Sequence, residues 1–196
     1  MRSEIAGVIL AAGSSSRLGT NKLLVELDGE ALVRRAARRA LAAGLDPLIV
    51  VLGFEADRVE AALTGLPLVT VVNPRHAEGM PTSLQAGLRA IPERCDAAVV
   101  LLPDMPLVTS EMLAELADRF RATGAPLVIS LYGEVAAPPT LYARALFPAL
   151  LAAGEGGRQV VREHRARAAE VRRPAELLVD LDLPADLERA RAPGGR

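Results

Sequence analysis

Residues 5–22 read IAGVILAAGSSSRLGTNK. The first part of this stretch, Ile5–Leu10, is a short apolar run of the length expected for a buried strand. The second part, Ala11–Asn21, is rich in glycine and serine, which favour loops. The pattern predicts a strand that runs directly into a glycine-rich loop, and the rest of the chain extends this arrangement.

Apolar runs of strand length alternate with segments of helical periodicity along most of the chain. Further strands are predicted at Pro47–Gly53, Leu66–Val72, Ala97–Leu102, Pro126–Leu131 and Leu177–Leu181. Helices are predicted at Glu30–Ala43, Ala56–Leu63, Met80–Ala90, Ser110–Arg121, Tyr142–Ala153 and Gly157–Ala168, with a short one from Pro184. Because several strands are apolar on both faces, helices are expected to cover both sides of the sheet. The sequence therefore predicts a single α/β domain over residues 1–196, with a three-layer α/β/α, Rossmann-like fold and a mostly parallel sheet.

Two features of these helices carry expectations of their own. Ser110 is expected to cap the helix that it begins, because a serine oxygen accepts a bond from the first turn. Four arginines lie on the polar face of the first predicted helix and are interpreted as solvent-exposed rather than as a polyanion site. They are Arg34, Arg35, Arg38 and Arg39.

The composition argues against several classes of partner. The chain has 23 basic and 24 acidic residues and a net charge of −1, which gives no electrostatic footprint for nucleic acid or an anionic membrane. The single cysteine, Cys95, provides neither an intrachain disulfide nor a zinc cluster. No apolar run approaches the roughly 18 residues that span a bilayer. We expect a cytoplasmic protein that binds neither nucleic acid nor membranes.

Lys22 is the only lysine among the 23 basic residues. Either chance has preserved it, or the loop needs a compact ammonium charge that arginine does not supply. Small residues in the same loop let the backbone approach a triphosphate, and Arg17 and Lys22 add positive charge. The spacing of Gly13 and Gly19 matches neither a Walker A loop nor the Gly-x-Gly-x-x-Gly fingerprint. Triphosphate binding is predicted, with an ordinary glycine–serine turn as the alternative.

Aspartates follow two of the predicted strands. Asp104 comes directly after Ala97–Leu102, within the sequence PDMP. A carboxylate there is well placed to hold Mg²⁺, which prefers one or two carboxylates together with phosphate oxygens and water. Capping of the turn is the alternative role for Asp104. Asp180 and Asp182 would share one face of the last strand, and either is a candidate metal ligand, helix cap or solvated residue.

The run from Leu10 to Lys22 resembles the signature loop of nucleotidyltransferases with a GT-A-like, Rossmann-related fold, a group that includes sugar-nucleotide pyrophosphorylases. Three further stretches narrow the resemblance: residues 79–88 (GMPTSLQAGL), residues 103–106 (PDMP) and residues 182–187 (DLPADL). With them, nearly the whole chain resembles the molybdenum cofactor nucleotidyltransferases (MobA-like NTP transferase domains). The most similar branch is the cytidylyltransferase that acts on molybdopterin.

This resemblance implies a reaction and a set of site residues. CMP would pass from CTP to a phosphorylated acceptor such as molybdopterin, with Mg²⁺ as cofactor and pyrophosphate as product. Arg17 and Lys22 would act in catalysis on the triphosphate, and Asp104 and Asp182 would bind the metal. Nucleotide binding would fall to Leu10, Ala11, Ala12, Gly13, Ser14, Arg17, Lys22 and Ser83. A molybdoenzyme or its chaperone would receive the product.

The resemblance leaves the choice of nucleotide and acceptor open. Ala12 resembles the pyrimidine-using relatives, whereas guanylyl-transferring relatives carry a second glycine there, so CTP is favoured over GTP. Gly154–Arg158 and Ala136–Tyr142 depart from the patterns of the branch where the acceptor is expected, and Leu183 replaces its usual threonine. A capping box formed by Thr82 and Gln85 is the alternative explanation of the residues around Ser83. A nucleotide-binding protein without turnover and a Rossmann oxidoreductase are the alternative functions.

Overall fold

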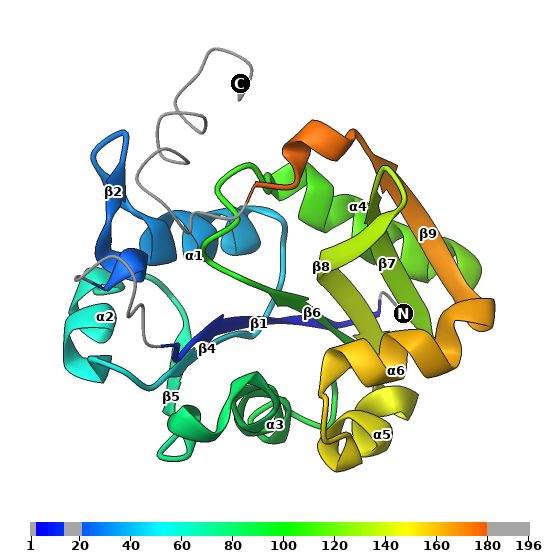
Figure 1. Ribbon diagram of the computed structural model, residues 1–196, viewed down its shortest axis with the longest axis horizontal. Coiled ribbons are helices and arrows are strands. Elements are labelled where there is room, and N and C mark those ends of the chain that lie inside the picture. Colours follow the sequence, from blue (N-terminus) through cyan, green and yellow to red (C-terminus); the bar gives the residue numbers. More distant parts are fainter. Residues whose placement is uncertain (1–2, 14–20, 180–196) are drawn as a thin grey trace.

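The computed structural model of the protein describes residues 3–13 and 21–179 (Figure 1). These residues form a central seven-stranded sheet in which the strands lie in the order β5-β4-β1-β6-β8-β7-β9. The strands are β1 (Ile5–Ala11), β4 (Leu48–Leu52), β5 (Val69–Val72), β6 (Ala97–Leu101), β7 (Leu127–Tyr132), β8 (Val135–Ala143) and β9 (Ala168–Arg173). A separate antiparallel ribbon is formed by β2 (Glu26–Leu27) and β3 (Glu30–Ala31).

Strand direction in the sheet is mostly parallel. Strand β1 runs parallel to β4 and β6, β5 runs parallel to β4, and β9 runs parallel to β7. Only β8 is antiparallel to its neighbours in the described sheet, and it separates β6 from β7. The predicted Rossmann-like fold with a mostly parallel sheet is therefore confirmed.

Helices cover both faces of the sheet, and each face has its own apolar core (Figure 1). Helices α1, α2 and α4 contribute to one core, and α3, α5 and α6 contribute to the other. Their bounds are α1 (Leu32–Ala42), α2 (Ala56–Ala62), α3 (Met80–Arg89), α4 (Ser110–Thr123), α5 (Phe147–Ala152) and α6 (Gly157–His164). Within the described part of the chain, no helix is long and apolar enough to cross a membrane.

Strand β1 is buried along its whole length and contributes side chains to both cores, because alternate side chains point to opposite faces of the sheet. Helix α3 packs closely on this strand at Gly87. A Cβ atom at Gly87 would lie 2.5 Å from Cγ1 of Val8, so glycine is required for the approach. The start of α3 lies near the carboxyl ends of β4 and β5, because Asn73, whose N–H donates to Leu52, binds Thr82 and Ser83 with its side chain.

The predicted helix over Tyr142–Ala153 is wrong in its first part. Tyr142 belongs to β8 and pairs with Ala98 of β6 and with Leu127 of β7. Pro138 and Pro139 make this segment look unlike a strand in the sequence, since proline normally interrupts a sheet. Here they lie where the register with β7 shifts between Ile129 and Ser130, at an irregularity that tolerates residues without an N–H donor.

The closing strand also differs from the prediction. Ala168–Arg173 forms β9, of which only Ala168 falls within a predicted element, as the last residue of the helix Gly157–Ala168. The predicted strand Leu177–Leu181 begins in a 3₁₀ turn, Ala175–Leu177, and residues 180–196 lie outside the described part. Strand β9 is a polar, half-exposed edge strand that lacks the apolar signal of the central strands.

The cap of α4 is Thr109 rather than Ser110, because the Oγ1 of Thr109 accepts a bond from the N–H of Met112 at 3.3 Å.

Candidate functional site

The candidate site lies at the carboxyl ends of three adjacent parallel strands. Gly13 follows β1, Gly53 follows β4 and Asp104 follows β6. In open α/β sheets ligands bind beyond this edge, where the loops that leave neighbouring strands diverge. The predicted residues of the loop after β1 and of the loop after β6 are therefore brought together by the order β4-β1-β6.

The end of β1 passes from buried residues to an exposed glycine. The side chains of Leu10 and Ala12 belong to one core and that of Ala11 to the other, and all three residues are buried. Gly13 is exposed, and a Cβ atom added there would meet no described atom within 4 Å. Packing within the described residues does not require glycine at position 13. Ser14 and Arg17 lie outside the described residues.

The loops after β1 and β4 touch at Gly53. A Cβ atom at Gly53 would lie 2.7 Å from the carbonyl oxygen of Ala12 and 2.6 Å from Cβ of His76. The N–H of Phe54 donates to the same Ala12 oxygen at 3.2 Å. Glycine at position 53 thus allows the two loops to meet, which fixes the direction in which the chain leaves β1.

Lys22 is held at the start of a short 3₁₀ turn, Lys22–Leu24. The buried Asn21 caps this turn, since its Oδ1 accepts a bond from the N–H of Leu23 at 3.1 Å. The Nζ atom of Lys22 lies 2.6 Å from Oδ2 of Asp104, and the two side chains are 20% and 17% exposed. The only lysine and the aspartate after β6, which are far apart in the sequence, therefore form a well-shielded ion pair.

The second oxygen of Asp104 makes the site suitable for a cation. Oδ1 is buried and has no hydrogen-bond partner among the described residues. Buried polar atoms are normally paired, so an unpaired carboxylate oxygen in this position fits a ligand that supplies positive charge. Oxygen donors of this kind suit hard divalent cations such as Mg²⁺. No cluster of three or more His, Cys, Asp or Glu that could hold a metal occurs among residues 3–13 and 21–179, and Asp180 and Asp182 lie beyond them.

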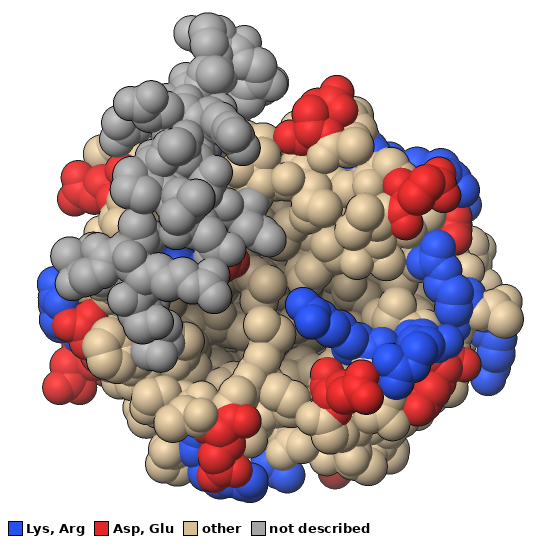
Figure 2. All heavy atoms as spheres, in the orientation of Figure 1, with Lys and Arg blue, Asp and Glu red and all other residues tan. Residues whose placement is uncertain are grey.

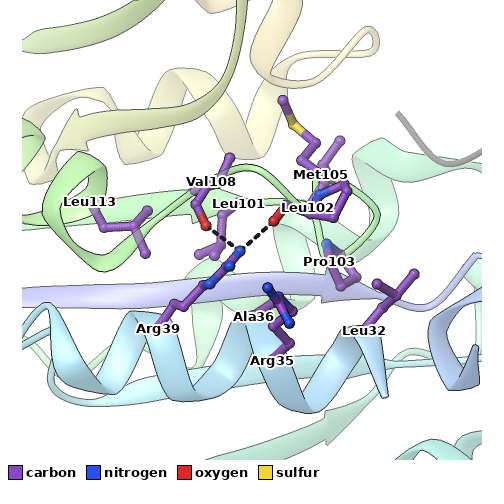
Figure 3. Close-up of a pocket in the computed structure, with 11 residues that line it drawn as sticks. Leu32, Arg35, Ala36, Arg39, Leu101, Leu102, Pro103, Met105, Val108 and Leu113 are labelled. Carbon is purple, nitrogen blue, oxygen red and sulfur yellow. Dashed lines mark hydrogen bonds between the residues drawn. The ribbon is translucent and has the colours of Figure 1, made fainter. Parts of the chain in front are cut away.

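The turn that carries Asp104 is attached to α1 by an arginine (Figure 3). Nη1 of Arg39 donates to the carbonyl oxygens of Pro106 at 2.5 Å and Val108 at 2.7 Å. Burial, together with the charge of Arg35, lowers the pKa of Arg39 from its usual value. The expectation that the arginines of this helix form a solvated face is therefore wrong for Arg39, although Arg38 is exposed.

Ser83 lies at the start of α3 and is 4% exposed. Nδ2 of Asn73 donates to the hydroxyl oxygens of Ser83 at 3.0 Å and Thr82 at 2.9 Å. The alternative explanation, a capping box of Thr82 and Gln85, is wrong. The helix begins at Met80, Oγ1 of Thr82 donates to the carbonyl of Gly79 at 2.9 Å, and Gln85 donates to the carbonyl of Leu151.

Asn73, which holds both hydroxyls, was not among the predicted site residues. It is 3% exposed, and its Oδ1 accepts a bond from the N–H of Arg75 at 3.0 Å, so that Nδ2 must face Thr82 and Ser83. Asn73 directly follows the predicted strand Leu66–Val72. The pattern that singled out Asp104, a polar residue after an apolar strand, was present here too.

The two stretches that depart from the family patterns come together in space. Tyr142, at the end of the first stretch, donates from its hydroxyl to the carbonyl of Gly157 in the second at 3.5 Å. A Cβ atom at Gly156 would lie 3.4 Å from Pro81, so this loop packs beside the start of α3. Burial raises the pKa of Tyr142 above its usual value.

Charged side chains of both signs are interleaved over α6 and β9 (Figure 2). Arg162 pairs with Glu155, and Arg165 pairs with Glu170. Arg172 contacts Glu134 as well as Glu170. This part of the surface is therefore an ion-pair network rather than a basic patch.

Comparison with known proteins identifies the family. The model of the MobA-like NTP transferase domain matches residues 7–169. The bifunctional protein GlmU of Kineococcus radiotolerans is 36% identical over 145 residues, which are 72% of this chain and 29% of that protein. The chain thus spans about a third of the length of the curated relatives that it matches.

Solved structures agree with this assignment. Rv0371c from Mycobacterium tuberculosis has a TM-score of 0.84 and 29% identity, over 96% of this chain and 98% of that one. A second structure of Rv0371c, in complex with manganese, has a TM-score of 0.76 and 27% identity over 95% and 97% of the two chains. Molybdopterin-guanine dinucleotide biosynthesis protein A from Archaeoglobus fulgidus shares the fold, with a TM-score of 0.68 and 20% identity over 94% and 96%. The chain belongs to the family of MobA-like NTP transferase domains, and it is a member of the nucleotidyltransferases.

Proposed function

We propose that this protein transfers CMP from CTP to a phosphorylated small molecule of the molybdopterin type and releases pyrophosphate. One observation carries the proposal: Lys22 and Asp104 form an ion pair at the carboxyl edge of the sheet, and the second Asp104 oxygen lacks a partner among the described residues. A cation and a phosphate chain would use this pair of charges together. The exposed main chain at Gly13 lies at the end of the neighbouring strand.

In this proposal, the positive charges of Arg17 and Lys22 bind the triphosphate. The base and ribose lie against the main chain of residues 10–13, with Ser14 and Ser83 nearby. Asp104 and Asp182 hold Mg²⁺, which neutralises charge on the phosphate oxygens when it is bound. Manganese in the complex of the similar protein Rv0371c supports a divalent cation for this chain as well.

The transfer needs positioning more than proton chemistry. An oxygen of the acceptor phosphate attacks the α-phosphorus of CTP, and the bond from that phosphorus to the oxygen that bridges to the β-phosphate breaks. Pyrophosphate leaves with the electron pair of this bond. Because the second ionisation of a phosphate monoester occurs near pH 6, the attacking oxygen is already charged at neutral pH. In such a reaction the side chains orient the reactants and neutralise charge.

The choice of CTP rests on Ala12, which the guanylyl-transferring relatives replace with glycine. The choice of a molybdopterin-type acceptor rests on the family resemblance. The departures at Ala136–Tyr142 and Gly154–Arg158 meet beside α3, which favours a different phosphorylated small molecule as the second candidate. If the acceptor is molybdopterin, a molybdoenzyme or its chaperone is the expected recipient of the product.

Pyrophosphate release tests the proposal. The protein is incubated with Mg²⁺ and molybdopterin or molybdenum cofactor, and CTP, GTP, UTP and ATP are compared. Release with CTP, lost in Lys22→Ala and Asp104→Ala, is the expected result. Release with GTP would keep the mechanism but overturn the interpretation of Ala12. Triphosphate binding without release for any nucleotide would contradict the proposed acceptor and would direct the search to other phosphorylated small molecules.

A further inference from the structure

Arg39 lies on α1, behind the turn that carries Asp104. Its guanidinium binds the carbonyl oxygens of Pro106 and Val108, which are two and four residues beyond the aspartate (Figure 3). Both acceptors are neutral main-chain groups. No ion pair joins Arg39 to an acidic residue of the described chain, so its contacts with the turn are not those of a surface salt bridge.

The turn has few main-chain hydrogen bonds of its own. Pro103 and Pro106 have no N–H group and so give the turn two donors fewer than other residues would. The N–H of Val108 donates to the carbonyl of Met105 at 3.2 Å within the turn. A small cavity between the turn and α1 is lined by apolar side chains such as Leu32 and Leu101 and by Arg35 and Arg39 (Figure 3). The side chains of Met105 and Val108 anchor the turn in the core, and the two bonds from Arg39 hold its main chain.

The position of this turn decides where the Asp104 carboxylate points. Oδ2 must reach Lys22, and Oδ1 must stay shielded and available to a cation. A guanidinium suits the task, since it donates in a fixed planar geometry and keeps its charge even when burial lowers its pKa.

We infer that Arg39 is a positioning residue for the Asp104 carboxylate, which it holds in the orientation that binds the metal. The inference rests on the proposed function, because it takes Asp104 as a metal ligand. In this role Arg39 contacts neither the metal nor the nucleotide, and it acts only through the main chain of the turn. Residues that orient a metal ligand typically change metal affinity by about 10- to 100-fold when they are replaced.

Arg34 provides a matched control on the same helix. Its Nη1 donates to the carbonyl oxygens of Ala62 and Thr64, both at 3.0 Å. Arg34→Met therefore removes the same kind of interaction from the same helix, but at the end of α2 rather than at the turn with Asp104. A purely structural role for Arg39 predicts similar behaviour of Arg34→Met and Arg39→Met.

The experiment measures Mn²⁺ binding by electron paramagnetic resonance, with CTP present and no acceptor, alongside thermal unfolding. Arg39→Met is expected to weaken Mn²⁺ binding by about 10-fold or more, whereas Arg34→Met changes it by less than about twofold. Arg39→Lys keeps a cation that can reach one carbonyl and is expected to bind Mn²⁺ with intermediate affinity. This variant also provides the test if Arg39→Met does not fold.

Asp104→Asn separates the two ways in which the inference can fail. If Asp104→Asn loses Mn²⁺ and both Arg39 variants bind it as the wild type does, Asp104 is a ligand but Arg39 does not position it. Equal loss in Arg34→Met and Arg39→Met overturns the inference too, because it reveals a general effect of α1. Unchanged Mn²⁺ binding in Asp104→Asn overturns the proposed metal site, and the role of Arg39 with it.

Discussion

The ammonium of Lys22 and the carboxylate of Asp104 lie 2.6 Å apart, across the space between the chain segments that follow β1 and β6. The pair joins two loops that leave adjacent parallel strands. It also means that, without nucleotide, the lysine occupies one of the two oxygens that a cation would use. Metal binding and triphosphate binding are therefore expected to depend on each other.

Lys22→Met is predicted to strengthen the binding of Mn²⁺ alone. Removal of the ammonium frees Oδ2 of Asp104, and the expected gain is about fivefold, or roughly 1 kcal/mol, the upper range for a single ion pair near the surface. With CTP present, the same variant should bind nucleotide more weakly. Calorimetric titration with Mn²⁺ and with CTP measures both effects, and weaker binding of Mn²⁺ alone would mean that Lys22 orients Asp104 rather than competing for it.

Asp104→Asn is predicted to lower the rate of pyrophosphate release by about 10² to 10³, the loss typical of one well-placed catalytic charge. The asparagine has nearly the same shape, so the chain should still fold, with a lower melting temperature because the shielded ion pair with Lys22 is lost. Asp118→Asn is the control, because Asp118 lies on α4, is 75% exposed and pairs only with Arg121 in the described structure. An Asp104→Asn protein with full activity would remove Asp104 from the mechanism.

Gly13→Ala is predicted to weaken CTP binding while it leaves the free energy of unfolding within about 0.5 kcal/mol, as for other surface changes without lost contacts. The added methyl group meets open space among the described atoms, so the folded chain accommodates it. A triphosphate close to the main chain does not. Chemical unfolding and CTP titration of the same preparation measure the two quantities, and normal CTP binding would indicate that the phosphates lie elsewhere.

Gly53→Ala is predicted to destabilise the fold by about 1–3 kcal/mol, the usual cost of an added group in a filled site. The new methyl group would overlap the carbonyl oxygen of Ala12 and the side chain of His76. Urea unfolding measures the change. Recovery in the double variant with His76→Gly, which removes the overlapping Cβ, would assign part of the cost to the histidine, and an unaffected single variant would mean that the two loops separate easily.

Burial raises the pKa of the Cys95 thiol, so this group is predicted to react slowly with iodoacetamide in the folded protein at pH 8. The raised pKa also affects stability. Below the ordinary thiol pKa both states are neutral, whereas at higher pH only the unfolded chain ionises, and the stability contribution falls. Labelling rates with and without denaturant, followed from pH 7 to pH 10, test this; rapid labelling of the folded protein would show that the thiol is accessible.

Sequence reasoning predicted the central strands well, because β4, β6 and β7 are buried on both faces and are apolar throughout. It missed β8 and β9 for opposite reasons. The prolines of β8 argue against a strand, although the irregular register of this strand accommodates them. Strand β9 lies at the edge of the sheet, where a strand can form from polar residues and so leaves no apolar run in the sequence. Both strands owe their conformation to pairing with distant segments, which a local pattern does not contain.

The candidate site was predictable where chemistry and position coincide in the sequence. Asp104 and Lys22 stand out as a carboxylate after an apolar strand and a lone lysine, and the structure joins them. Asn73 follows a strand in the same way but carries no charge. Arg39 looked like one of several arginines on a helix, and only the folded chain reveals that its partners are carbonyl groups 67 and 69 residues away.

The placement of β8 has a consequence for how such a chain can diversify. Its pairing with β6 covers residues 97–100 and stops before the turn that carries Asp104. The stretches that meet at Tyr142 and Gly157 come after every described residue of the proposed nucleotide site. Drift, insertion or recombination downstream of α4 can therefore reshape the neighbourhood of α6 while Lys22, Asp104 and the rest of the described site are inherited unchanged. Under the proposed function, hybrid chains joined in the segment between α4 and β7, with Asp182 kept in both parents, would be a direct way to exchange acceptor preference between members of the family.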